Sequence, residues 1–340
     1  MSERVVYCTY FDSGYLSRGL ALIDSMRERG DDSSVWVMTL DDASHAYLVD
    51  AALPGVVPIT VAELEAAVPE LLPLKADRTR MEYYFTMTPL LVRHVMDAHP
   101  EPIVVAYLDA DLYFFGDPRE VVKALGTGSV GIIEHRYRPR LARRLAKYGR
   151  FNVGWVGFRS DDDGRRCLAW WGESTLAWCG DHPSEGRYAD QGYLDQFPDF
   201  AGVRILPSSG FNLAPWNTAN RRVEATSAGL TIDGDPLVFF HFHGVKRTPQ
   251  WWMTSQLVYG APLSADLRGE VYVPYLRRLE QFDALVAASA QAPRPAAASR
   301  GTGIRGLLFR AQRGALGILN VLTGNAIRAN TLQLFGGTRE

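Results

Sequence analysis

The stretch IVVAYLDAD, residues 103–111, joins an apolar run to a pair of aspartates. Ile103–Leu108 is the most continuous apolar run in the first half of the chain, and such a run is typical of a strand in a parallel sheet covered on both faces. Asp109 and Asp111 follow directly, and side chains two residues apart point the same way on an extended chain. Because ligands of such sheets bind beyond the carboxyl ends of the strands, we expect the two carboxylates to face a binding site.

Short apolar runs alternate with helical periodicity on both sides of this stretch, which predicts an α/β fold with a parallel sheet between helices. The predicted strands are Val5–Thr9, Val35–Leu40, Val56–Ile59, Ser129–Glu134, Val153–Phe158 and Pro236–Phe242. The predicted helices are Tyr15–Met26, Glu82–Met96 and Arg165–Trp178, with Pro89 starting or kinking the second. Asp41 is expected to cap a further helix.

The composition is that of a globular protein able to bury a sizeable core. The chain has 340 residues, of which 47% are hydrophobic and 22% charged, so it has one large domain or two ordinary ones. Its net charge of -2 argues against nucleic-acid binding through overall basic charge. Three cysteines without paired spacing (Cys8, Cys167 and Cys179) argue against disulfides and a zinc site and favour reduced thiols.

The charge is unevenly distributed along the chain. Residues 284–340 contain seven arginines, one glutamate and no lysine or aspartate, which gives this part +6 and leaves -8 for residues 1–283. We predict a globular domain over residues 1–285, an Ala/Pro-rich linker over 286–303 and a basic amphipathic helical tail over 304–340. The tail either packs on protein or lies on a membrane surface. Neither a signal peptide nor a membrane-spanning segment is predicted.

Two carboxylates at a strand end are suited to Mg²⁺ or Mn²⁺, with phosphate oxygens as the remaining ligands. The Asp-x-Asp pattern alone is weak, because it also occurs at Asp161/Asp163 and Asp233/Asp235, where the surrounding residues indicate turns. Only Asp109 and Asp111 follow an apolar strand, which favours metal binding there over a surface pair.

The segment FFHFHGVKR, residues 239–247, places two histidines on alternate positions at another strand end. An imidazole of His241 or His243 suits a metal site that carboxylates begin, and Lys246 and Arg247 suit a phosphate. The alternative is a pair of hydrogen-bonded histidines followed by a solvated basic pair.

Two further segments carry polar side chains, and one of these side chains suits a sugar. Asn152 in FNVGWVGF, residues 151–158, has an amide that matches hydroxyl groups, and its neighbouring glycines permit close approach; a glycine-containing core strand is the alternative. Asp190 and Gln191 lie in YADQG, residues 188–192, and the alternative interpretation of this segment is the polar start of a helix. Trp251 and Trp252 are either an acceptor platform or part of the core.

Taken in order from Val5 to Trp252, these segments resemble the GT-A nucleotide-sugar glycosyltransferases, particularly glycosyltransferase family 8 and its bacterial relatives. The resemblance implies one GT-A, Rossmann-like domain, with a mixed, mostly parallel sheet flanked by helices. It implies that the side chains of Asp109, Asp111 and His241 bind a divalent cation.

The same resemblance assigns the donor and the reacting groups. It implies that Thr9 and Tyr10 lie against the nucleotide and that Lys246 or Arg247 holds the diphosphate. It also implies that Asn152 contacts the donor sugar and that Asp190 and Gln191 line the reacting face. The family's usual arginine before a proline is missing near Pro89, and Arg80 is the expected substitute.

The implied reaction moves a sugar from a nucleotide diphosphate-sugar, expected to be a UDP-sugar, to an acceptor hydroxyl with Mn²⁺ or Mg²⁺ and with retention of configuration. A glycan or lipid-linked acceptor in cell-surface glycan or glycolipid synthesis would place the protein in the cytoplasm, in contact with the inner face of the membrane. The alternatives are a sugar-nucleotide nucleotidyltransferase and a non-catalytic glycan-binding or scaffold protein. The metal interpretation requires His241 to lie beside the two aspartates.

Overall fold

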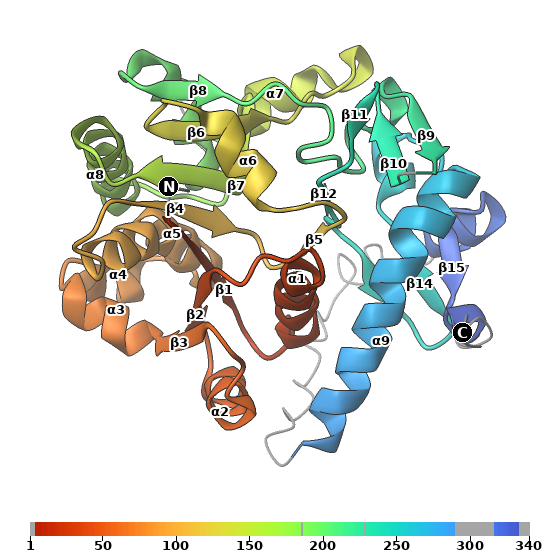
Figure 1. Cartoon of the computed structure of the whole chain (residues 1–340), viewed down its shortest axis with the longest axis horizontal. Helices are drawn as coiled ribbons and strands as arrows, with labels where there is room; N and C mark the ends of the chain where they lie inside the picture. Colours follow the sequence, from red (N-terminus) through yellow and green to blue (C-terminus); the bar gives the residue numbers. More distant parts are fainter. Residues whose placement is uncertain (1–3, 185, 228, 290–315, 333–340) are drawn as a thin grey trace.

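The computed structural model describes residues 4–184, 186–227, 229–289 and 316–332, and its centre is a seven-stranded sheet (Figure 1). The strand order is β3-β2-β1-β4-β7-β6-β8, and four of the six neighbouring pairs are parallel. Only β7 runs against its neighbours. The strands are β1 (Arg4–Phe11), β2 (Ser34–Thr39), β3 (Val56–Thr60), β4 (Ile103–Leu108), β6 (Val130–Glu134), β7 (Phe151–Arg159) and β8 (Val203–Ile205). The predicted α/β class, with a mixed, mostly parallel sheet, is confirmed.

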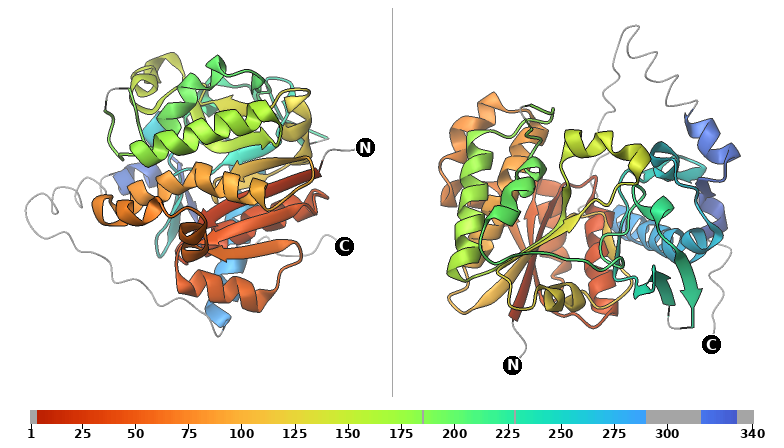
Figure 2. Two further views of the ribbon diagram at one scale, coloured as in Figure 1. Left: turned by 90° about the vertical axis from the view of Figure 1, so that its left-hand side faces the viewer. Right: turned by 90° about the horizontal axis from the view of Figure 1, so that it is seen from above.

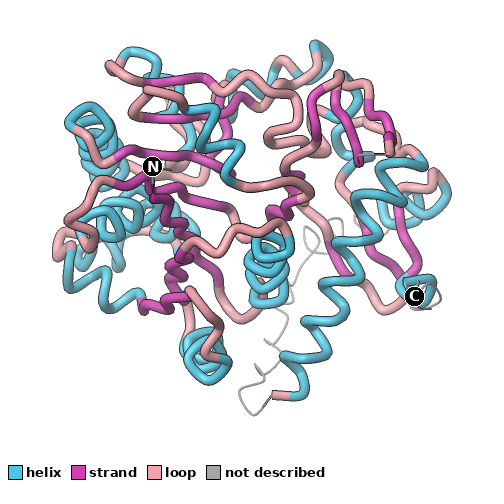
Figure 3. The backbone as a smooth tube through the Cα atoms, viewed as in Figure 1, coloured by secondary structure: helices cyan, strands magenta, loops and turns pink. Residues whose placement is uncertain are grey.

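Helices cover both faces of this sheet, as the second view of Figure 2 shows. One face packs against α5 (Arg80–Asp97) and α8 (Asp162–Ala177), and the other packs against α1 (Leu16–Glu28). The tube of Figure 3 shows the same alternation of strand and helix through the first half of the chain. The remaining helices of this half are α2 (Asp42–Ala51), α3 (Val61–Ala67), α4 (Leu71–Asp77), α6 (Arg119–Leu125) and α7 (Arg143–Tyr148).

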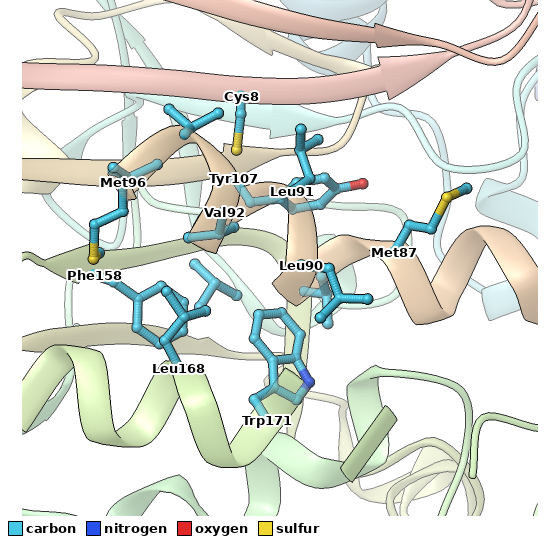
Figure 4. Close-up of a cluster of buried hydrophobic side chains, with 14 of the residues drawn as sticks. Cys8, Met87, Leu90, Leu91, Val92, Met96, Tyr107, Phe158, Leu168 and Trp171 are labelled. Atoms are coloured by element: carbon cyan, nitrogen blue, oxygen red, sulfur yellow. The ribbon is translucent and has the colours of Figure 1, made fainter. Parts of the chain in front are cut away.

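The core between the sheet, α5 and α8 is built from large apolar side chains (Figure 4). Met87 and Leu90 of α5 are fully buried, and the rings of Phe158 and Trp171 stack with centroids 5.8 Å apart. Burying side chains of this size contributes roughly 1.5–3 kcal/mol each. Trp171 also donates from Nε1 to the backbone oxygen of Asp190 at 2.9 Å, so the core fixes a loop that carries a predicted site residue.

Helix starts follow the local capping rules. Asp41 accepts a hydrogen bond from the backbone of Ser44, which confirms it as the cap of α2, and Thr79 caps α5 with a capping box. Pro89 lies inside α5 rather than at its start. The interpretation of Asp161 as part of a turn is wrong, because its side chain caps α8.

The second half of the chain adds short strands at the edge of the main sheet. The run predicted as one strand, Pro236–Phe242, is divided into β11 (Asp235–Pro236) and β12 (Phe239–His241). β12 pairs with β5 (Leu112–Phe114), the strand that directly follows the two aspartates, and His241 lies opposite Leu112. The remaining strands of this region are β9 (Val223–Thr226), β10 (Gly229–Ile232), β13 (Lys246–Arg247) and β14 (Trp251–Met253).

The described part of the predicted tail packs on the body. β15 (Ala326–Arg328) pairs with β14, and Thr254 donates to the backbone oxygen of Asn325 at 2.8 Å. Residues 316–322 are helical, whereas 290–315 and 333–340, which hold most of the predicted linker and tail, lie outside the described residues. α9 (Val273–Ala288) precedes them and packs beside α1 (Figure 1). Within the described ranges, no helix is both long and apolar enough to span a bilayer.

All three cysteines are free and buried, as expected for idle thiols. Trp252 belongs to the core and is 2% exposed, which resolves one of the two alternatives for this residue.

Candidate active site

A cavity of about 1040 Å³ opens where β1 and β4 end, at the edge predicted to bind a ligand. Its wall includes many residues that the sequence singled out, drawn from segments far apart in the chain. They are Tyr10, Arg80, Asp109, Asp111, Asn152, Asp190, Gln191, His241 and His243.

His241 lies between the two predicted metal-binding aspartates. Its Nε2 is 3.1 Å from Oδ1 of Asp111 and 3.6 Å from Oδ2 of Asp109. The pairing of β12 with β5 produces this approach, because the strand that ends at His241 runs beside the strand that begins after Asp111. The metal interpretation required His241 to lie beside the two aspartates, and this requirement is met.

A second contact fixes the orientation of the His241 ring. Nδ1 lies 3.2 Å from Oδ1 of Asn152. That oxygen also accepts from the side chain of Asn212 at 3.1 Å and from the backbone of Gly154 at 3.2 Å. Because Oδ1 is an acceptor, Nδ1 is assigned the proton, and this leaves the lone pair on Nε2 toward the carboxylates in neutral His241.

The amides of Asn152 and Gln191 are held by the protein itself. Nδ2 of Asn152 donates to Oε1 of Gln191 at 2.9 Å, and Nε2 of Gln191 donates to the backbone oxygen of Tyr148 at 2.7 Å. The two side chains line the cavity, but these hydrogen bonds give them a positioning role for His241 and for the loop that contains Tyr148.

Gly154 leaves room for this arrangement. A Cβ atom at residue 154 would lie 2.6 Å from Oδ1 of Asn152 and 2.7 Å from Nδ1 of His241. Sequence reasoning expected the glycines of this segment to admit a ligand. The structure shows that Gly154 admits the imidazole of His241.

The acidic and imidazole groups fit a divalent cation. One ligand atom each from Asp111, His241 and His243 lies within 4.8 Å of the others, and Asp109 adjoins His241. Ligands about 2.2 Å from a common ion lie up to about 4.4 Å apart, so small adjustments complete such a site. Carboxylate oxygens suit Mn²⁺ and Mg²⁺, and the imidazole nitrogen suits a transition metal, so the mixed set favours Mn²⁺.

The protonation behaviour of this group reflects its close charges. Burial alone would raise the pKa of Asp111, but the charge and hydrogen bond of His241 outweigh it and hold the pKa at about 2. Burial raises the pKa of Asp109, whose side chain is farther from His241. Burial would lower the pKa of His241, but the negative charges of Asp111 and Asp109 raise it.

Asp190 faces the same cavity from a constrained loop. It is 4% exposed, and burial followed by the negative charge of Asp109 raises its pKa to about 7. The preceding residue, Ala189, has φ of 47°, a left-handed conformation that is costly for a residue with a side chain. The surrounding structure maintains this conformation in part through the hydrogen bond from Trp171.

One side of the cavity, here named the Tyr10 wall, consists of Tyr10, Asp12, Arg80 and Tyr84. Arg80 donates to the hydroxyl of Tyr84 at 2.7 Å and pairs with Asp12 at 3.1 Å. The rings of Tyr10 and Tyr84 are 6.5 Å apart. Arg80 thus lies at the cavity, where the sequence placed it as a substitute for the missing arginine.

Three other predicted residues do not line this cavity. Thr9 is fully buried, and its hydroxyl has no hydrogen-bond partner among the described residues. Lys246 and Arg247 are exposed on β13, and Arg247 pairs with Glu280 at 2.9 Å.

A second part of the cavity wall was mostly missed by the sequence reasoning. It is named the Tyr259 wall and consists of Arg144, Tyr148, Tyr188, Trp216 and Tyr259. Tyr188 belongs to the segment YADQG, but the others come from α7, a 3-10 helix and a loop, where no motif or periodicity distinguishes them. Only the fold brings them together.

The fold and the cluster define a class of α/β protein in which acidic and imidazole side chains meet at the carboxyl edge of a mixed sheet. The chain belongs to the same family as the uncharacterized protein YfnF of Bacillus subtilis (strain 168), to which it is 33% identical over 251 residues, 71% of this chain and 81% of YfnF. It is also similar to the uncharacterized protein YfnD of the same organism, at 29% identity over 279 residues, 81% of this chain and 89% of YfnD. No protein-family model matches the chain.

Among solved structures, the galactosyltransferase LgtC in complex with donor and acceptor sugar analogues is 16% identical, with 81% of this chain and 95% of LgtC covered and a TM-score of 0.49. The bifunctional glycosyltransferase WbbM in its apo form is 16% identical, with 82% of this chain and 50% of WbbM covered and a TM-score of 0.48. Mouse xyloside xylosyltransferase 1 is 13% identical, with 73% and 100% covered and a TM-score of 0.45.

Proposed function

We propose that this protein is a metal-dependent glycosyltransferase that moves a sugar from a nucleotide diphosphate-sugar to an acceptor hydroxyl. The observation that carries the proposal is the position of His241 Nε2, 3.1 Å and 3.6 Å from the carboxylates of Asp111 and Asp109 in a cavity of about 1040 Å³. Asp190 lies in the wall of the same cavity.

Asp109, Asp111 and His241 would hold the divalent cation, with His243 beside them. When bound, the cation supplies positive charge that neutralises the diphosphate leaving group. Asn152 keeps Nε2 of His241 directed at the carboxylates, so the ligand set is oriented before the donor arrives.

The reaction breaks the bond between the anomeric carbon and the diphosphate oxygen, and the bonding electron pair leaves with the diphosphate. The anomeric carbon then carries positive charge until the acceptor oxygen bonds to it and releases its proton to the diphosphate. Asp190, ionised above its raised pKa, would stabilise the positive charge. We propose retention of configuration, as the resemblance to family 8 implies.

The Tyr10 wall suits the nucleotide. Its aromatic rings provide stacking faces for a base, and the guanidinium of Arg80 provides a cation at the cavity. We propose a UDP-sugar as the donor. Lys246 or Arg247 would contact the diphosphate only after a change of side-chain position, because neither lines the cavity.

Exposed apolar side chains on the described part of the tail suit a membrane surface. Ile318, Leu319 and Leu322 are 64%, 44% and 78% exposed. We propose that they contact the inner face of the membrane beside a lipid-linked or glycan acceptor in cell-surface glycan or glycolipid synthesis.

Removal of one metal-binding carboxylate tests the proposed activity. Asp109→Ala and Asp111→Ala should each abolish the stabilisation of the protein by UDP with Mn²⁺ and lower donor turnover by about 100-fold or more, because the diphosphate loses its counter-charge. Thermal unfolding with a nucleotide panel and a donor-hydrolysis assay measure both effects.

Asp163→Ala is the matched control, because Asp163 is exposed on α8 and pairs only with Arg166 among the described residues. Unchanged UDP binding and turnover in both site variants would overturn the proposal. Stabilisation by a nucleoside triphosphate with release of diphosphate would favour a nucleotidyltransferase, and saccharide binding without turnover would favour a non-catalytic protein.

A further inference from the structure

The Tyr259 wall extends directly from the proposed metal site. The ring of Trp216 is 5.1 Å from that of His241 and 5.9 Å from that of Tyr259, measured between centroids. The proposed function places the nucleotide on the Tyr10 wall, so the Tyr259 wall is the part of the cavity left for a second substrate. The cavity of about 1040 Å³ lies at the upper end of the roughly 300–1000 Å³ range of small-molecule sites.

Arg144 contributes a cation to this wall. Its guanidinium lies 4.6 Å from the ring centroid of Tyr259 and 5.9 Å from that of Tyr148. Within the described ranges, no carboxylate pairs with Arg144 and no hydrogen bond occupies its N–H groups. Its neighbour Arg143 on α7 is exposed and does not line the cavity, whereas Arg144 is half-buried.

Such a cation favours an anionic ligand. Contact with aromatic faces offsets part of the desolvation of a guanidinium, but its five N–H donors match a carboxylate or a phosphate. The carboxylates of Asp109 and Asp111 contact His241, and neither forms an ion pair with Arg144 within the described ranges.

The rest of the wall suits a sugar ring. Tyr148 and Tyr188 pack edge to face, with centroids 4.9 Å apart, and both line the cavity. Trp216 is 3% exposed, and its Nε1 donor has no partner among the residues that the structure describes. Aromatic faces with one spare donor are a common setting for a saccharide bound through stacking and few hydrogen bonds.

We infer that the Tyr259 wall is the acceptor subsite and that Arg144 selects an acceptor saccharide bearing an anionic group, either a carboxylate or a phosphate. The inference rests on the proposed function, because that function assigns the other wall to the donor. It adds the charge of the acceptor and the residue that recognises it.

The test compares three probes that share one ring: methyl glucuronide, glucose 6-phosphate and methyl glucoside. Their affinities are measured by ligand-observed NMR on the full chain, with UDP and Mg²⁺ and again without nucleotide. We expect wild type to bind an anionic probe about fivefold more tightly than methyl glucoside. Arg144→Gln should remove that preference, and Arg143→Gln, which makes the same charge change one residue away, should retain it.

The carboxylate and phosphate probes distinguish the two sources of negative charge. No preference in wild type, or a preference that persists in Arg144→Gln, would overturn the inference. UDP affinity is measured first in each variant, and weaker UDP binding in Arg144→Gln would assign the residue to the donor instead. If wild type fails to bind UDP with metal, the proposed function fails, and the titrations without nucleotide still decide whether Arg144 recognises an anionic saccharide.

Discussion

Asp190 shows how burial sets the charge of a single side chain. Its carboxyl group is almost completely enclosed and lies near Asp109, so its pKa of about 7 exceeds the ordinary value of 3.8. The folded state consequently keeps a proton between about pH 4 and pH 7 that the unfolded chain has lost. The contribution of Asp190 to stability is therefore most favourable at acid pH and declines as the pH rises to 7.

The substitution Asp190→Asn removes this dependence of stability on pH. In metal-free protein, the stability of the variant relative to wild type should increase by about 2–3 kcal/mol between pH 5 and pH 8, because the wild-type carboxylate becomes charged in a buried site. Urea denaturation at the two pH values measures the difference. The variant should also lose turnover more than donor affinity, because the positive charge to be stabilised develops only during reaction.

A relative stability that is the same at both pH values would contradict the raised pKa. Asp163→Asn serves as the control, since the side chain of Asp163 lies at the surface and is 38% exposed.

At the scale of elements, the pairing of β5 with β12 and the close packing of β7 form the site. β4 begins and ends where the sequence predicted, since its apolar run is a local signal. The division of Pro236–Phe242 into two strands was not predictable, because it depends on which strand lies alongside. Asp109 and Asp111 were found from their position after an apolar strand, and the family resemblance selected His241 over His243. Arg144 and Tyr259 belong to segments without a motif and come together only through tertiary packing.

β7 supplies a prediction about close packing. Gly154→Ala places a methyl group against Asn152 and His241, so it should weaken Mn²⁺ affinity about tenfold or more by displacing the imidazole. Calorimetric titration of Mn²⁺ measures the effect. Gly157→Ala is the matched control on the same strand, because its Cβ would meet the ring of Trp155 instead.

Both substitutions should lower the melting temperature, since both overpack the interior. Only Gly154→Ala should alter metal affinity. Equal Mn²⁺ affinity in the two variants would show that His241 does not depend on the room that Gly154 leaves.

At the scale of the whole molecule, the chain has an acidic body and a basic C-terminal part, and the described residues 316–332 of that part pack on the body. The +6 of residues 284–340 and the -8 of residues 1–283 are opposite charges on one chain. β15 joins β14 at a defined register, so the described part of the tail is integrated with the fold. The exposed apolar side chains of residues 316–322 remain available to an outside surface.

Flotation with vesicles tests the membrane proposal on the full chain. Wild type should float with vesicles containing anionic lipid and remain below with neutral vesicles, because arginines attract the headgroups. Ile318→Asp combined with Leu322→Asp should reduce flotation by about tenfold. Val49→Asp combined with Leu72→Asp, which replaces exposed apolar residues elsewhere, is the control. Equal flotation of the two double variants would show that the tail does not contact the membrane.

The pairing of β15 with β14 decides where this polypeptide tolerates engineering. Cutting it after α9 would strip a strand from a small sheet and remove Ile327, which is 3% exposed and pairs with Trp252. If this shortened protein were inactive, the cause would be damage to the fold rather than the loss of a segment that contacts the membrane. An affinity tag is better attached before Arg4, since the cavity lies at the other end of β1.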